Sequence, residues 1–222
     1  MNRMEHRLRS RGGLVYWLVA VALLASGFVV GELWPAHFLH LLRPSILHIQ
    51  HIARTIDRNG NALTAIWTVF WNNTRVALLM MVLGVFAGVF PIFTMWTNGL
   101  MMGVVTHVTA AHVHVQGWKV VLFGEMPHGI FELTALTWAC ALGLRLAVAA
   151  LQSVWALLGK GGAKGASGGL ALARVENETP VANFRQEVRH VIGRIPFILA
   201  ILWVAACIEI LVTPHLIRAF LG

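Results

Sequence analysis

Charged residues are scarce in this chain: they make up 12% of its 222 residues, against 58% hydrophobic residues. So little charge cannot cover the surface of a soluble domain, which excludes the soluble globular class. Cysteine is rarer still, because Cys140 and Cys207 are the only two and both lie in apolar runs. A disulfide framework and a four-cysteine metal site are therefore excluded. The composition predicts an integral membrane protein.

Established catalytic motifs are missing as well. The sequence contains no nucleophile elbow, no Walker loop and no His-Glu-x-x-His pattern, so we expect no enzymatic activity and no catalytic residue. The net charge of +8 does not indicate nucleic-acid binding, because the basic residues gather beside hydrophobic runs instead of lining one soluble face. We expect membrane lipids, and no nucleic acid, as partners.

Five apolar runs are long enough to cross roughly 30 Å of hydrocarbon at about 1.5 Å per residue. They cover residues 14–34, 76–96, 99–115, 130–151 and 195–212. The sequence thus predicts an all-α fold, a polytopic membrane helix bundle with about five transmembrane helices plus interfacial amphipathic helices. Residues 1–222 form a single integral membrane domain in this interpretation.

The segments between the runs are expected at the membrane surface or in water. Isoleucines recur near helical spacing after Pro44, which predicts an amphipathic helix along the membrane. Residues 62–71 are apolar but end at Asn-Asn-Thr-Arg, so we expect an interfacial or partly inserted segment, with a sixth span as the alternative. The glycine-rich composition after residue 158 predicts a flexible cytoplasmic linker over residues 159–180. Residues 181–189 are expected to form a short basic helix on the inner membrane surface.

Basic residues precede the first and the last run. Lysine and arginine beside membrane spans stay in the cytoplasm, and both groups obey this rule if the chain crosses the membrane five times. We therefore expect a multi-pass protein of the cell membrane with its amino terminus in the cytoplasm and its carboxyl terminus outside. Residues 125–132 then face the outer side.

Two carboxylates and a histidine stand at the start of the fourth run, in Glu125-Met-Pro-His-Gly-Ile-Phe-Glu132. His128 and Glu132 are one helical turn apart and point to the same side. Three interpretations remain open: these side chains satisfy one another within the bundle, they bind zinc or another divalent metal, or they transfer protons or ions. The metal interpretation draws its ligands from His128, Glu132, Glu125, His107 and His112, with His114, Glu209 or His215 as further candidates.

Small residues recur at four-residue spacing, which lets helix backbones approach closely. The positions are Gly84 and Gly88, Gly99 and Gly103, and Ala139 with Gly143. They predict helix packing within one chain or, alternatively, a dimer seam. Pro91 is expected to kink the second run, and Asn98 to cap a helix or satisfy the turn there. Arg145 needs either a partner or a path to the inner interface, and its side chain is expected to extend to that interface.

Several of these features together resemble the stage II sporulation protein M family. The resemblance covers residues 65–150, and its most specific part is the Pro-His-Gly-Ile-x-Glu element in a membrane setting. The residues that carry it are Asn72, Asn73, Gly84, Gly88, Asn98, Gly99, Gly103, Pro127, His128, Gly129, Ile130, Phe131, Glu132 and Gly143.

This resemblance implies a function. The family's namesake is a polytopic membrane protein that anchors two peptidoglycan-degrading partners, stage II sporulation proteins D and P, during engulfment of the forespore. A similar chain is expected to be a non-enzymatic membrane scaffold, and a homodimer, that localises cell-wall-remodelling partners. Two alternatives stay open. One is a metal-dependent membrane hydrolase, and the other is a transporter or channel that uses His107, Glu132, Arg145 and Glu209.

Overall fold

The computed structural model of the protein describes residues 3–41, 61–158 and 180–220. Within these ranges the regular structure is entirely helical, which confirms the all-α prediction. The main helices are α1 (Arg3–Leu33), α3 (Ala62–Leu83), α4 (Val89–His112), α5 (Gly117–Lys119), α6 (Met126–Leu158), α7 (Pro180–Leu211) and α8 (Thr213–Phe220). A π-helical segment, η1 (Val120–Glu125), joins α5 to α6.

Five helical stretches in the described part of the chain are long and apolar enough to cross a membrane, as the composition predicts. Their bounds are Gly13–Leu33, Ala62–Leu83, Val89–His112, Gly117–Ala156 and Phe184–Leu211. The protein is therefore a multi-pass membrane protein.

The bounds of the second and third spans differ from the predicted ones. A turn at residues 84–88 interrupts the run predicted as a span over 76–96, because Ala87 and Gly88 have positive φ angles of 54° and 72°. The segment 62–71, predicted as interfacial, is instead the first half of α3, whose amino terminus is capped by the Asn61 side chain. The prediction failed because it took the polar sequence after residue 71 as the end of a helix.

Part of that polar sequence finds partners inside α3: the Asn72 amide donates to Asn73 Oδ1 at 3.5 Å, and the guanidinium of Arg75 lies over the Trp71 ring at 5.5 Å from its centroid. Thr74 is buried, and its hydroxyl has no hydrogen-bond partner among the described residues. Pro91 lies in the first turn of α4, where a proline costs no helical hydrogen bond, so it does not kink the second span. Asn98 is not a cap, since it lies within α4 and its amide donates to the Thr94 carbonyl at 2.8 Å.

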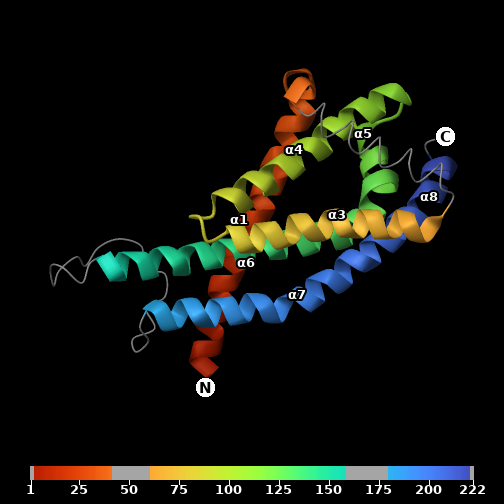
Figure 1. The fold of residues 1–222 in the computed structure, drawn as a ribbon. Helices are drawn as coiled ribbons and strands as arrows, with labels where there is room; N and C mark the ends of the chain where they lie inside the picture. Colours follow the sequence, from red (N-terminus) through yellow and green to blue (C-terminus); the bar gives the residue numbers. More distant parts are fainter. Residues whose placement is uncertain (1–2, 42–60, 159–179, 221–222) are drawn as a thin grey trace.

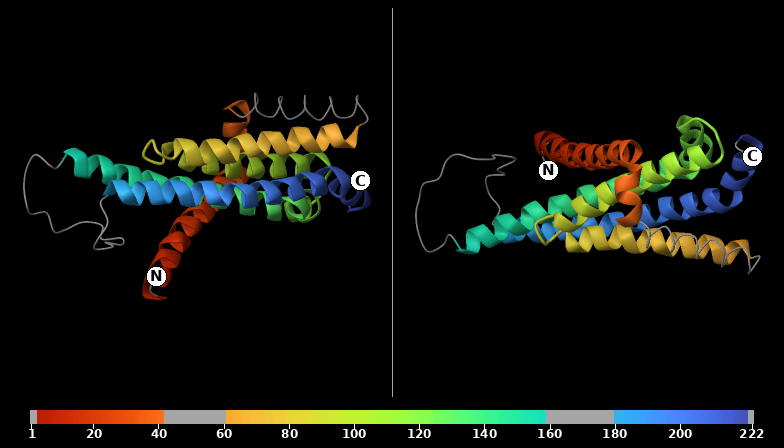
Figure 2. Two further views of the ribbon diagram at one scale, coloured as in Figure 1. Left: turned by 60° about the horizontal axis from the view of Figure 1, so that its bottom comes forward. Right: turned by 90° about the horizontal axis from the view of Figure 1, so that it is seen from above.

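The long helices form two groups. α3, α6 and α7 lie side by side, whereas α1 crosses this group steeply and packs mainly against α4 (Figures 1 and 2). From α3 to α7 the successive spans run in alternating directions (Figure 1), as expected for consecutive membrane crossings. The core between them is filled by long apolar side chains, chiefly Met80, Met81, Met95, Leu136, Ile198 and Leu202.

Glycines bring the backbones of two helix pairs into contact. A Cβ atom added at Gly99 or Gly103 of α4 would overlap the Leu24 or Phe28 carbonyl oxygen of α1. A Cβ atom added at Gly84 would overlap the Gly143 carbonyl oxygen of α6, and one at Gly143 would overlap that of Met80. These glycines therefore pack within one chain. Sequence analysis missed their partners in α1, Gly27 and Gly31, although both show the same spacing.

Three predictions about surface segments meet two different outcomes. The amphipathic helix after Pro44 and almost all of the linker at 159–180 lie outside the described residues. The short basic helix at 181–189 is not a separate element, because residues 180–211 form one continuous helix, α7. Polar and apolar parts of the sequence share this helix because backbone hydrogen bonding continues through both.

Gly143→Ala should destabilise the bundle by about 1–3 kcal/mol, because the new methyl group has to push α3 away from α6. The matched control is Gly193→Ala in α7, where an added Cβ meets no atom within 4 Å. It should leave stability unchanged or raise it by about 0.4–1 kcal/mol. Unfolding of the detergent-solubilised protein by increasing SDS, followed by circular dichroism, measures both. Equal stability of the two variants would contradict the α3–α6 contact.

Candidate functional site

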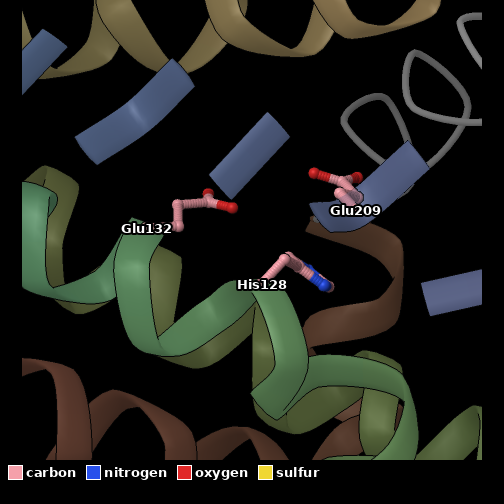
Figure 3. A group of neighbouring side chains, drawn as sticks. All are labelled: His128, Glu132 and Glu209. Carbon is pink, nitrogen blue, oxygen red and sulfur yellow. The ribbon is translucent and has the colours of Figure 1, made fainter. Parts of the chain in front are cut away.

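His128 and Glu132 of α6 meet Glu209 of α7 inside the bundle (Figure 3). One nitrogen or oxygen atom from each of these side chains lies within 4.8 Å of the other two, and all three side chains are half-buried. We refer to these three residues as the His-Glu-Glu cluster. The prediction that His128 and Glu132 share a helix face is confirmed, and Glu209 was one of several candidates for a third ligand.

The backbone before the cluster is irregular. In η1 the turns are wider than in an α-helix, and Pro127, one residue into α6, has no amide with which to continue the α-helical hydrogen-bond pattern. Glu125, the last residue of η1, reaches α4, whereas His128, in the first turn of α6, reaches Thr213 at the start of α8. Gly129 makes no close backbone contact with another helix, since the nearest atom to an added Cβ is Leu133 Cδ1, at 3.9 Å.

Neighbouring polar groups orient two members of the cluster. His128 Nδ1 lies 3.2 Å from the Thr213 hydroxyl, and that hydroxyl donates to the Ile208 carbonyl at 3.4 Å. The Asn73 side chain of α3 makes a hydrogen bond with Glu132, and Asn72 in turn donates to Asn73 at 3.5 Å. By their residue numbers, Asn73 and His128 are 55 positions apart in the sequence. The hydrogen bond between Asn73 and Glu132 therefore brings together the Asn-Asn pair and the Pro-His-Gly-Ile-x-Glu element.

Glu209 differs from the other two members. Glu209 makes no hydrogen bond or ion pair with any residue in the described ranges. The charged group that acts on it electrostatically is the carboxylate of Glu132. Two carboxyl groups therefore face each other within a membrane span, beside an imidazole. Such a set can share protons or bind a cation between its members.

A second polar cluster lies nearby between α1, α4 and η1. The Thr106 hydroxyl donates to Glu125 Oε1 at 2.6 Å, and His107 Nδ1 lies 3.5 Å from Glu32 Oε1. The second carboxylate oxygens of Glu32 and Glu125 are buried and have no hydrogen-bond partner among the described residues. The ligand set predicted for one metal site is therefore split between two places.

The remaining histidine candidates lie apart from both clusters. His112 is exposed at the carboxyl end of α4, and His114 is exposed in the turn that follows, with a positive φ of 55°. His215 is exposed on α8. Their exposure is the reason that they do not complete the site: each lies where the chain leaves the packed bundle.

Arg145 has a partner on a neighbouring helix, which is the alternative to an extension toward the inner interface. Its guanidinium donates to Glu187 Oε1 of α7 at 2.7 Å and lies 3.5 Å from His190 Nε2. The two side chains are only 17% and 23% exposed, so the pair is largely shielded from solvent. Because α6 and α7 pack against each other, Glu187 of α7 lies within reach of Arg145 and balances its charge.

Sequence analysis also missed Glu32, Thr106, Glu187 and Thr213. Thr213 was recognisable only as a residue before a proline that can start a helix. The other three carry no local pattern, since their partners lie between 19 and 75 positions away in the sequence. The available signal was the general rule that ionisable residues inside a span face protein and have partners.

The family comparison covers most of these elements. The family model for stage II sporulation protein M matches residues 18–214, from α1 to the start of α8. The chain belongs to this family. No curated protein and no solved structure matches it. As a member of the stage II sporulation protein M family, it is a membrane protein of a sporulation family, and both polar clusters lie within the matched residues.

Asn73→Leu should lower the free energy of unfolding by about 1–3 kcal/mol, because it removes the hydrogen bond to Glu132 within the bundle. Asn72→Leu is the matched control: its side chain is exposed, and the change should stay within about 0.5 kcal/mol. The SDS unfolding measurement described above applies to both. Equal losses in the two variants would show that Asn73 does not support Glu132.

Proposed function

We propose that this protein is a non-enzymatic membrane scaffold that localises peptidoglycan-degrading partners at the cell membrane. The observation that carries the proposal is membership of the stage II sporulation protein M family over residues 18–214. The family's namesake anchors stage II sporulation proteins D and P, and partners similar to these are the first to test.

The arrangement of the helices supports a surface for partner binding at one end of the bundle. α5, η1 and α8 gather at the end opposite to the one where α6 ends and α7 begins (Figure 1). The rings of Phe123 in η1 and Phe220 in α8 stack with centroids 4.3 Å apart, which ties the last helix to this end. Trp118 and Leu122 are exposed beside them. We propose that this end faces outward, toward the cell wall.

The charge distribution supports the same orientation. Arg185 and Arg189 lie in the first third of α7, near the end where α6 stops. Positive charges near span ends favour the cytoplasmic side. Together with the five helices of membrane-spanning length in the described residues, this charge distribution supports an amino terminus inside and a carboxyl terminus outside.

A reporter fused to either terminus tests this topology. A reporter that is active only outside the membrane should be active after Gly222 and inactive before Met1. A reporter that fluoresces only in the cytoplasm should give the reverse pattern. Activity of the same reporter at both termini would contradict an odd number of crossings, and exchanged signals would reverse the proposed orientation.

Deletion of the gene tests the scaffold itself. Fluorescently labelled D- and P-like hydrolases should spread over the membrane in the deletion strain, and a plasmid copy of this chain should restore their positions. The same hydrolases should co-purify with the tagged protein from detergent extracts. Hydrolases that stay in place without this chain would refute the scaffold proposal.

The proposal includes a homodimer. The glycines at the close helix contacts already pack within one chain, so a dimer would use exposed apolar faces instead. Light scattering of the protein in detergent measures its mass and thereby shows whether one or two chains are present.

A further inference from the structure

We propose that the His-Glu-Glu cluster, His128, Glu132 and Glu209, binds one divalent transition-metal ion, with zinc as the first candidate. The cluster brings together one imidazole and two carboxylates from α6 and α7, with ligand atoms within 4.8 Å of one another. This inference stands apart from the scaffold proposal, because it rests on the side chains of the cluster and not on a partner.

Charge is the first argument. Glu132 and Glu209, both half-buried, face each other between α6 and α7, where the packed helices screen their repulsion less than bulk water does. Among the described residues, none donates a hydrogen bond to Glu209 or forms an ion pair with it. The basic side chain of Arg145 forms its ion pair with Glu187 instead. A cation between the two carboxylates and His128 supplies the missing positive charge.

The protonation of His128 is the second argument. The Thr213 hydroxyl has one hydrogen, which it donates to the Ile208 carbonyl oxygen. Thr213 can then only accept from His128, which assigns the imidazole proton to Nδ1. The lone pair is left on Nε2, as in metal-bound histidines whose other nitrogen donates to a neighbouring group.

Glu132 is oriented in a similar way. Asn72 donates to the side-chain oxygen of Asn73, which leaves the Asn73 amide group to donate to Glu132. Both residues of α6 in the cluster therefore have an outer partner that fixes the side chain, as expected around a metal site. Thr213 and Asn73 are positioning residues here and do not touch the ion.

The ligand set selects the class of metal. Tetrahedral zinc with bonds of about 2.0 Å holds its ligand atoms about 3.3 Å apart, so the ligand atoms, which lie within 4.8 Å of one another, have to approach by up to about 1.5 Å when the ion binds. Imidazole nitrogen with carboxylate oxygen suits zinc and its first-row neighbours, whereas calcium and magnesium take oxygen ligands. Three protein ligands leave a further position for water or another group.

Metal content and affinity test the proposal on the full-length protein in detergent. Mass spectrometry should find about one zinc per chain in wild type, and titration with zinc against a chelator gives the affinity. Glu209→Gln keeps the shape of the side chain and should weaken zinc binding more than 100-fold, beyond the roughly 10- to 100-fold loss expected for Thr213→Val. Cobalt in place of zinc should give visible absorption bands that both variants change.

Glu125→Gln is the matched control, because Glu125 is a half-buried carboxylate on the same span that belongs to the other polar cluster. It should bind zinc like wild type, and circular dichroism checks that every variant is folded. Folded wild-type protein without zinc affinity would overturn the proposal. Binding that is lost on replacing the exposed His112 and His114, but kept in Glu209→Gln, would overturn it as well. Neither result affects the localisation test of the scaffold.

Discussion

Backbone contact at glycines is the constraint on which the other features of this bundle depend. Gly27 and Gly31 of α1 cross Gly99 and Gly103 of α4, and Gly84 meets Gly143 between α3 and α6. In a membrane, helices gain little from burying apolar surface against one another, so close packing has to supply the attraction. These contacts fix the separation of four helices and thereby decide which polar side chains can meet.

The polar side chains inside the spans form pairs across helices. Arg145 meets Glu187, Thr106 meets Glu125, and Asn73 meets Glu132, each from a different helix. A polar group in hydrocarbon is costly unless it has a partner, so each pair also links the helices that carry it. Glu209 has no such partner among the described residues, and the His-Glu-Glu cluster is the place for which we propose a bound cation.

The π-helical segment η1 separates the two polar clusters. Glu125 and His128 are three residues apart, yet one reaches Thr106 of α4 and the other Thr213 of α8. Residues at this spacing lie near one face of a regular α-helix, and here the boundary between η1 and α6 falls between the two residues. The family element that begins at Pro127 therefore starts where the helix regains its α-helical phase.

The sequence by itself determined the membrane class, the helical fold, five spans, the shared face of His128 and Glu132, and the family. Each of these depends on composition or on local spacing, which sequence records directly. Only the tertiary structure decided the turn at Gly88, the length of α3, the partner of Arg145 and the choice of Glu209 over His107 and His112. These depend on contacts between distant helices, whose crossing points are set by packing and are not encoded in any local pattern.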